Sequence, residues 1–555
     1  MFVEVLVGGV LFYTAWSILA LHMNYRRASS MGIPLIRLPV DPLNVPFQVL
    51  EPHLFRLLDL LPIPLPAFLY HLRRGWYFRD KADAHLKIGP VWALVTPRDI
   101  HLHVSDSEAI HSVFSRRGDF IRPSKMYKLL EVYGPCISTA DATNWPRHRK
   151  ILAAPFNEAA MSYVWSESLR QTQQMMEAWA SSSEVASAAK DTRTLSLNVL
   201  AAIGFRRSFS FRTSDESVTE RDGGMFSYRD ALQIVLDNVI LLMLIPPRYL
   251  VHSWVPASLR RIGTAASDFK THMMTMLDEE NKSMSRGEKG AGSLMTSFIR
   301  ALDVRTNDTE SNISHGLSVD EIFGNIFVIN FAGHDTTANT LAFSMLLLAA
   351  FPDVQQWVAE ELDRIIPKTP SSDWTYVGLF PRLVRCRAVL FETLRLYPPI
   401  MALPKWTTNH PTPLRVGNRE IMIPPHTGVQ PNIIATQTHP NYWPSPLVWN
   451  PSRWIITSSN GPTHEEMYVP PRDTFFPWSD GPQNCLGVKF SQVEFVAVLV
   501  GLLRENRLAV VKQRASETDS EATARVWKVA NDCDAQMLLR MKNPDRVKLR
   551  LQKVR

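Results

Sequence analysis

The sequence predicts a mainly helical protein with a small β-rich part and one N-terminal membrane helix. Apolar residues recur at helical spacing from about residue 105 to residue 400. Residues 412–434 instead alternate and turn like short strands, and residues 86–104 have the pattern of a hairpin with a Gly-Pro turn. Residues 5–25 contain no Asp, Glu, Lys or Arg. These observations together predict the fold class.

The uncharged N-terminal stretch has the length of a membrane span. At ~1.5 Å per residue, a helix over residues 5–25 spans roughly 30 Å, the thickness of a bilayer core. Arg26 and Arg27 follow it and only Glu4 precedes it, so the positive-inside rule places the N-terminus in the lumen and the rest in the cytosol. A cleaved signal peptide is the alternative, but its charged n-region and small-residue cleavage site are missing. We therefore expect an uncleaved anchor over residues 1–25.

The rest of the chain divides into a linker and one large body. Residues 26–66 are rich in proline, which fixes φ and resists helix, so we expect a stiff hinge that lifts the body, residues 67–555, off the membrane. Alternatively, the apolar side chains of residues 54–68 rest on the bilayer surface. Residues 507–555 hold polar turns and strand-like runs, which predict a terminal hairpin. Polar breaks fall at 211–224, 281–293 and 303–317, and the last two predict exposed loops.

Composition excludes several classes of protein. The 555 residues carry a net charge of +7 that is spread along the chain, without the Lys/Arg tract of a nucleic-acid-binding arm. We therefore expect no nucleic-acid partner, although a mildly basic surface suits an anionic membrane or an acidic protein. The four cysteines are scattered and have neither zinc-site spacing nor the pattern of a disulfide scaffold, which favours a reducing compartment.

Cys485 has the most informative surroundings of the four cysteines. It lies where the loop 475–487 meets an apolar helix predicted from Val488 to about Leu503. Helix N-termini favour negative charge, so we expect this thiol to ionise easily. Gly481 allows a sharp turn and Gly487 allows a flat group to approach the backbone. A single thiolate below a wide slot suits an axial ligand of haem iron, whereas a buried free cysteine is the simpler interpretation.

Trp145 and Arg149 are four residues apart in a segment predicted to be helical. They therefore share one helical face, where an indole N–H and a guanidinium together suit a carboxylate ligand. An amphipathic basic helix without a ligand is the alternative interpretation of the same segment.

Residues 321–350 predict a long apolar helix with a polar middle. Ser318 and Glu321 form a capping-box pattern at its start, and its only charges are Glu321 and Asp335. A buried acid is costly and usually functional, and the hydroxyl of Thr336 beside it can bond to the helix backbone and hold water. A second membrane span and a core helix with a stray polar cluster are the alternatives.

Glu392 and Arg395 place an acid and a base one turn apart on an apolar helix. Such pairs are commonly surface contacts that contribute little. Arg453, in the segment Asn450-Pro451-Ser452-Arg453-Trp454, is a candidate third member of this cluster.

Four separated stretches resemble the motifs of the cytochrome P-450 superfamily, in the family's order. Its haem-binding loop is Phe-x-x-Gly-x-Arg-x-Cys-x-Gly, and Trp478, Gly481, Cys485 and Gly487 fall on its positions, with Gln483 in place of the arginine. Residues 332–337 (Ala-Gly-His-Asp-Thr-Thr) resemble the oxygen-binding helix motif, residues 145–149 the Trp-x-x-x-Arg pair, and residues 392–395 the Glu-x-x-Arg motif. The resemblance covers roughly residues 30–555.

The resemblance implies a fold and a set of ligands. The fold is a large helical lobe and a small β-rich lobe with haem b (iron protoporphyrin IX) between them. The implied roles are Cys485 as axial ligand of the iron, Asp335 and Thr336 as a proton relay, Glu392, Arg395 and Arg453 as a structural triad, and Trp145, Arg149 and Lys405 as ligands of the haem propionates. Gln483 departs from the family's arginine and weakens that anchoring.

The implied activity is monooxygenation of an apolar small molecule. One atom of O2 enters the substrate, and the electrons come from a separate NADPH–cytochrome P-450 reductase. The chain is similar to microsomal members of the endoplasmic reticulum membrane, with the catalytic domain in the cytosol, and residues 477–482 are similar to fungal members that act in secondary metabolism. A haem-thiolate isomerase or dehydratase and a non-enzymatic haem sensor are the alternatives; Asp335 and Thr336 speak against the first.

Overall fold

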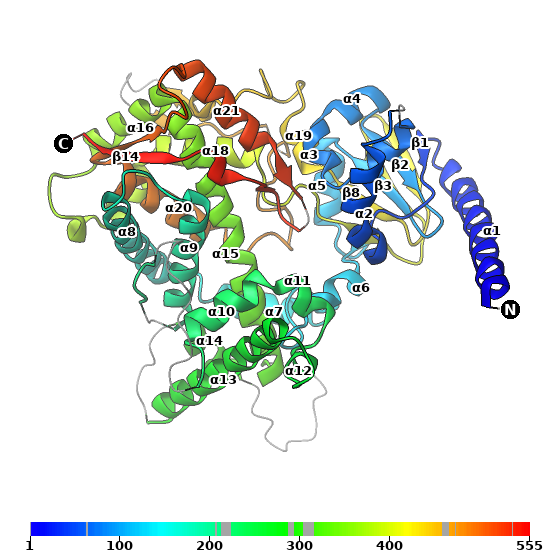
Figure 1. The fold of residues 1–555 in the computed structure, drawn as a ribbon, viewed down its shortest axis with the longest axis horizontal. Helices are drawn as coiled ribbons and strands as arrows, with labels where there is room; N and C mark the ends of the chain where they lie inside the picture. The colour runs from blue at the N-terminus through cyan, green and yellow to red at the C-terminus, as the bar shows by residue number, and fades with distance from the viewer. Residues whose placement is uncertain are drawn as a thin grey trace.

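A large helical body and a smaller lobe built on a sheet make up the fold (Figure 1). The computed structural model describes residues 2–62, 65–205, 208–212, 224–286, 293–302, 316–457, 465–471, 473–535 and 537–554. Residues 213–223, 287–292 and 303–315 of the polar breaks lie outside these residues, and the loop predicted to begin at 281 is corrected, because residues 281–285 continue helix α13 (Ala257–Ser285).

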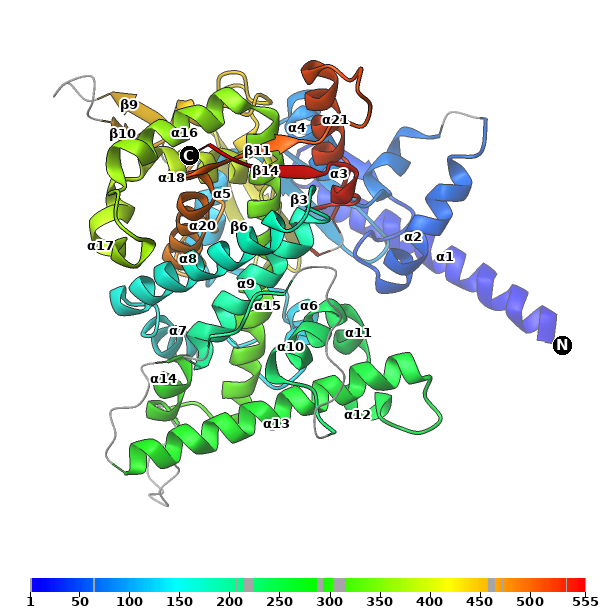
Figure 2. The same cartoon turned by 60° about the vertical axis from the view of Figure 1, so that its left-hand side comes forward.

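Helices α7 to α18 and α20 form most of the helical body, as Figures 1 and 2 show from two directions. The first helices of the chain are α1 (Phe2–Ser29), α2 (Val45–Leu58), α3 (Trp76–Asp80), α4 (Asp83–Ile88), α5 (Ser107–Ser115), α6 (Ser124–Tyr127), α7 (Trp145–Ala153), α8 (Glu158–Ala180), α9 (Ala188–Phe205), α10 (Tyr228–Asp237) and α11 (Val239–Leu244). The later ones are α12 (Pro247–Leu250), α13 (Ala257–Ser285), α14 (Leu294–Arg300), α15 (Val319–Ala350), α16 (Pro352–Ile365), α17 (Tyr376–Leu379), α18 (Val384–Leu396), α19 (Ile433–Gln437), α20 (Val488–Leu503) and α21 (Asp519–Asn531).

One six-stranded sheet organises the smaller lobe, with strand order β1-β2-β3-β8-β5-β4. Its buried side chains form an apolar core of their own, beside the larger core of the helical body. The remaining strands pair as β6 with β7, β9 with β10, β11 with β14 and β12 with β13. The strands are β1 (Leu35–Arg37), β2 (Val91–Val95), β3 (Ile100–Val104), β4 (Phe120–Ile121), β5 (Lys405–Thr407), β6 (Thr412–Val416), β7 (Arg419–Ile423), β8 (Gly428–Pro431), β9 (Ile455–Thr457), β10 (Glu465–Met467), β11 (Asn506–Val510), β12 (Cys533–Asp534), β13 (Arg540–Met541) and β14 (Leu549–Lys553).

Local sequence explains where the two central helices begin. Helix α15 begins at the predicted capping box, in which the Ser318 hydroxyl accepts from the Glu321 N–H and the Glu321 carboxylate accepts from the Ser318 N–H. Helix α20 runs over the predicted residues, and nearly all of it is buried. Both helices are apolar on every side, which is typical of helices at the centre of a large core.

The proline-rich segment differs from the predicted hinge. Strand β1 within it pairs in parallel with β2, and the buried Asp41 accepts hydrogen bonds from Thr96 and His101. Helix α2 forms despite two prolines, because Pro46 lies in the first turn, where a helix needs no N–H, and Pro52 is accommodated inside it. The segment therefore packs on the sheet lobe instead of standing clear of it.

Two other predictions are corrected. The hairpin of β2 and β3 exists, but its turn lies at 96–99, because Gly89 ends helix α4 and Pro90 precedes the first strand. The C-terminal segment contains the predicted pairing of β11 with β14, but it also contains helix α21. A capping box of Thr518 and Glu521 opens that helix, a local signal that the strand prediction overlooked.

Helix α1 extends away from the rest of the molecule (Figures 1 and 2). Its end is docked, because Ala28 is buried and the Asn24 amide donates to the Thr96 carbonyl at 3.0 Å. Among the described residues, length and composition qualify no single helix to cross a bilayer; α15 and α16 pass only as a pair with a 107° bend. The exposed large apolar residues of α1 are Val7, Val10, Leu11, Phe12, Tyr13, Trp16, Ile18, Leu19 and Met23.

Glu494 on α20 is a carboxyl group inside the apolar core. It is fully buried and neither of its oxygens has a hydrogen-bond partner among the described residues. Burial raises its pKa to about 8, and the nearby Ser196 hydroxyl offsets this only in part. Glu494 is therefore largely protonated at neutral pH.

Because Glu494 is protonated in the folded state, the free energy of unfolding should fall as pH rises. In the folded state Glu494 keeps its proton up to about pH 8, whereas in the unfolded chain it releases the proton near pH 4.5. The contribution of Glu494 to the free energy of unfolding is therefore fully present below pH 4.5 and is lost as pH rises to about 8. We expect the unfolding free energy of Glu494→Gln to decline less than that of the parent between pH 6 and pH 8.5, by a few kcal/mol at most. Urea titration followed by tryptophan fluorescence measures this free energy at each pH. Equal slopes for the parent and the variant would contradict this assignment.

Candidate active site

The loop that carries Cys485 is fixed from both lobes. Gly481 has φ +66°, and a Cβ at this position would lie 2.6 Å from the Phe114 carbonyl oxygen of α5, so only glycine fits. On the other side, the Cys485 N–H donates to the Trp478 carbonyl at 2.9 Å, and the Trp478 indole donates to the Ser491 hydroxyl of α20 at 3.0 Å. These contacts determine where the thiol at the start of α20 lies.

The Cys485 thiol is accessible, yet it does not ionise as easily as predicted. Surrounding protein atoms raise its pKa by desolvation; the Gly487 N–H, 3.3 Å from Sγ, and the charge of Arg149 act in the opposite direction without outweighing it. A metal ion that coordinates a thiol removes its proton, so a raised pKa of the free thiol does not prevent a thiolate from binding a metal. A Cβ on Gly487 would meet only Cys485 Sγ, at 3.8 Å, which leaves open space beside the thiol.

Helix α15 has one solvent-accessible turn near its middle. Ala332 is exposed and Thr336 half-buried between the buried stretches 322–328 and 340–350, and the two lie on one face because they are four residues apart. The Thr336 hydroxyl donates to the Ala332 carbonyl at 2.8 Å, as its position predicted. Gly333 faces elsewhere, since a Cβ there would lie 3.0 Å from Leu200 of α9. The turn leaves room for a ligand at Ala332 and Thr336.

Asp335 is held in an ion pair that sequence reasoning missed. The Arg193 Nε of α9 donates to its carboxylate at 2.7 Å, and the same guanidinium donates to Asp237 of α10 at 3.0 Å. Burial raises the pKa of Asp335, but His334 and Arg193 outweigh it and lower the pKa overall. No local pattern marks Arg193, because 142 residues separate it from Asp335. Asp335 is therefore ionised and tethered in this conformation.

Three cations gather near the Cys485 loop. Arg149 of α7 donates to the carbonyl and side-chain oxygens of Asn484 at 2.6 and 2.5 Å, and Lys405 of β5 donates to Gln483 Oε1 at 2.5 Å. Arg122 lies close enough to both to disfavour their charges, and desolvation with this repulsion lowers the pKa of Lys405 to about 7. Within the described residues, none of the three cations pairs with a carboxylate. No carboxylate of the described residues therefore balances the positive charge of this cluster.

Trp145 adds a donor without an acceptor to the same region. Its indole N–H is buried and unpartnered among the described residues, and the Arg117 guanidinium lies 5.0 Å above its ring. An anionic group with several acceptor oxygens would satisfy both the indole and the cations. The two propionates of haem meet this requirement, and the open side of Gly487 accommodates a flat ring, so the residues present fit haem. Arg117 and Arg122 were not predicted as members of this cluster.

The structure brings the predicted triad together. The Arg395 guanidinium makes two hydrogen bonds of 2.9 Å to the Glu392 carboxylate, and the Arg453 Nε donates to the same carboxylate at 3.0 Å. The Trp454 indole and the Asn450 N–H also donate to it, at 2.9 and 2.8 Å. Because the carboxylate is fully buried and completely hydrogen-bonded, the cluster fixes α18 to the segment 450–454.

Comparison with known proteins agrees with this geometry. The family model described as Cytochrome P-450 matches residues 60–530. A cytochrome P-450 monooxygenase of Postia placenta is 31% identical over 76% of this chain and 78% of its own. A phomenoic acid biosynthesis cluster cytochrome P-450 monooxygenase of Leptosphaeria maculans is 29% identical over 87% of each chain.

Solved structures share the fold as well. The crystal structure of a cytochrome P-450 haem domain, P-450DA, covers 89% of this chain and 97% of its own with a TM-score of 0.64, at 19% sequence identity. The match to the family model spans most of the chain, including the Cys485 loop, the solvent-accessible turn of α15 and the Glu392 triad. The chain belongs to the cytochrome P-450 family.

Proposed function

We propose that this protein is a haem-thiolate monooxygenase that inserts one oxygen atom from O2 into an apolar small molecule of secondary metabolism. The observation that carries the proposal is the accessible Cys485 thiol beside a cationic cluster without counter-charge. The printed name of the Leptosphaeria maculans relative places that protein in a biosynthesis cluster, which supports the substrate class. Electrons would come from a separate NADPH–cytochrome P-450 reductase.

The chain's own residues would bind haem b and control protons around it. Cys485 would supply the axial thiolate, and haem held in this way supplies the activation of O2. Trp145, Arg149 and Lys405 would bind the propionates, joined by Arg122, while Gln483 orients Lys405 instead of adding a charge of its own. Gly481 and Gly487 would shape the loop beneath the ring.

Asp335 and Thr336 would deliver protons to the site from helix α15. Thr336 lies at the solvent-accessible turn of α15, where its hydroxyl can hold a water molecule against the helix. Asp335 must first leave Arg193, because a carboxylate held ionised by a guanidinium is a poor proton donor. Arg193 is therefore a positioning residue whose contact to Asp237 links this step to α10.

We also propose that α1 anchors the enzyme in the endoplasmic reticulum membrane, with the catalytic domain in the cytosol. The exposed apolar side chains of α1 and the arginines of its last turn support this proposal. The docked end of α1 indicates that the anchor is best removed before residue 20, so that Asn24 and Ala28 keep their contacts.

Removal of residues 2–19 should release most of the enzyme from microsomes while haem uptake is retained, because a membrane span binds far more firmly than surface contacts. Flotation of microsomes and haem content per chain measure the two effects. A truncated enzyme that floats as fully as the parent would place the anchor elsewhere.

Thr336→Ala should bind haem and substrate but waste NADPH as peroxide. Proton delivery by a positioned group contributes about 10²- to 10⁴-fold, so product per NADPH should fall at least about tenfold. The measurement uses membranes that contain an NADPH reductase and a panel of terpenoid and polyketide substrates. Thr340→Ala is the matched control, because its hydroxyl bonds to the Thr336 carbonyl one turn further on in a buried position. Equal coupling in the parent and Thr336→Ala would refute the proton-delivery role.

Arg149→Ala should lose haem faster than the parent, by about tenfold or more, since a hydrogen bond to a charged group contributes about 1.5–3 kcal/mol. Haem transfer to apomyoglobin measures this rate. Arg147→Ala controls for general damage to α7, because Arg147 pairs with Glu321 instead of the Cys485 loop. If both variants lose haem at the same rate, Arg149 does not bind a propionate.

A further inference from the structure

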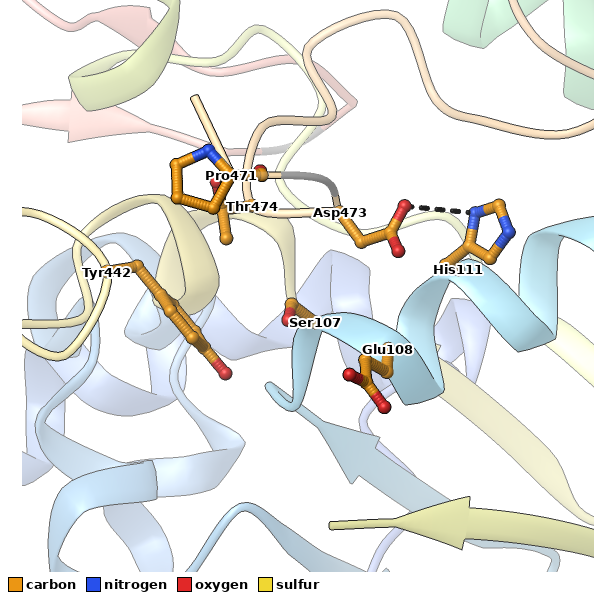
Figure 3. Close-up of a pocket in the computed structure, with 7 residues that line it drawn as sticks. All are labelled: Ser107, Glu108, His111, Tyr442, Pro471, Asp473 and Thr474. Atoms are coloured by element: carbon orange, nitrogen blue, oxygen red, sulfur yellow. Dashed lines mark hydrogen bonds and ion pairs between the residues drawn. The ribbon is translucent and has the colours of Figure 1, made fainter. Parts of the chain in front are cut away.

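A mixed cluster of metal-binding side chains lies outside the haem site. His111 comes from α5, Asp473 from the segment before the Cys485 loop and Asp480 from the loop itself. His111 Nδ1 lies 2.5 Å from Asp480 Oδ2 and 3.2 Å from Asp473 Oδ1. One ligand atom from each of the three residues lies within 4.8 Å of the others. Figure 3 shows His111 and Asp473 turned toward one another.

The cluster opens onto a pocket of about 580 Å³. The Ser115 hydroxyl lies 3.3 Å from His111 Nε2 and holds the imidazole so that Nδ1 faces the carboxylates. All three side chains of the cluster are half-buried, so solvent and ions reach them through the pocket. Its lining residues are Ser107, Glu108, His111, Tyr442, Pro471, Asp473 and Thr474.

The three side chains together offer the ligand atoms of a zinc site. His111 Nδ1 faces one oxygen of Asp480 at 2.5 Å and one oxygen of Asp473 at 3.2 Å, so the three side chains direct their ligand atoms toward one another. One imidazole nitrogen and two carboxylate oxygens are ligands that zinc accepts at about 2.0–2.2 Å, usually in tetrahedral geometry with a fourth ligand.

We propose that His111, Asp473 and Asp480 bind a divalent cation of the zinc type, with a water molecule from the pocket as the fourth ligand. The metal takes the place of the proton on His111 Nδ1, and that proton leaves to solvent. Ligand atoms within 4.8 Å of one another need only small side-chain movements to reach this geometry.

A metal at this place would join α5 to the Cys485 loop. Asp480 directly precedes Gly481, whose backbone packs against Phe114 of the same helix α5. The Asp480 carboxylate also accepts a hydrogen bond of 2.7 Å from the Gly481 N–H, so movement of the carboxylate is transmitted to the loop. The bound metal would therefore restrain the loop and slow the loss of haem.

The test uses the full-length, haem-loaded enzyme after treatment with a chelator. Calorimetry then measures the binding of added Zn²⁺. NADPH is left out, so the result does not depend on the proposed catalytic activity. We expect one Zn²⁺ per chain in addition to the haem iron. Asp473→Asn and His111→Ala should each weaken binding by at least about tenfold. Asp473→Asn keeps its side-chain shape, so it remains informative if His111→Ala does not fold.

Glu108→Gln is the matched control, because it removes one negative charge from the same pocket without removing a proposed ligand. Coordination predicts that Asp473→Asn weakens binding far more than Glu108→Gln does. Equal effects of the two variants, or no stoichiometric binding to the parent, would overturn the site. Zn²⁺ should also slow haem transfer to apomyoglobin in the parent but not in Asp473→Asn, and an unchanged rate in the parent would overturn the proposed restraint of the loop.

Discussion

The structure depends on how one loop is held between two lobes while its thiol stays accessible. Gly481 packs against α5 of the sheet lobe, and Trp478 bonds to α20 of the helical body. Arg149 adds a third connection through both oxygens of Asn484, directly before Cys485. Because each contact comes from a different part of the chain, Cys485 keeps its place only when both lobes are folded and docked. The position of the Cys485 thiol is thus a product of the whole tertiary structure.

The second constraint is electrostatic. Arg122 lies close enough to Arg149 and to Lys405 for like charges to disfavour one another, an arrangement that costs free energy. The Glu392 cluster shows the opposite case, since its buried carboxylate is fully matched by two arginines and an indole. The Glu392 cluster is thus satisfied within the chain, whereas the cationic cluster is the one that we propose to bind a ligand with its own negative charge.

Local motifs predicted the mainly helical fold with its small sheet, α15, α20 and the meeting of Glu392 with Arg453, because capping boxes, apolar runs and motif order are properties of contiguous sequence. Contacts between distant residues could not be predicted in this way. Arg193 carries no local signal for its pairing with Asp335, and Arg122 none for its place beside Lys405. The expectation of an easily ionised Cys485 was wrong because it counted the helix terminus and omitted the desolvation that the packed loop imposes.

The most direct test of this account is the absorption spectrum of the reduced, CO-bound enzyme. If Cys485 is the axial ligand, the parent shows the Soret band of thiolate-ligated haem, and Cys485→Ser loses that band even where it retains haem. The other three cysteines remain in the variant and serve as internal controls, since Cys136 and Cys386 are buried and Cys533 is partly buried. A thiolate-type band that persists in Cys485→Ser would assign the ligand to another cysteine and contradict the account.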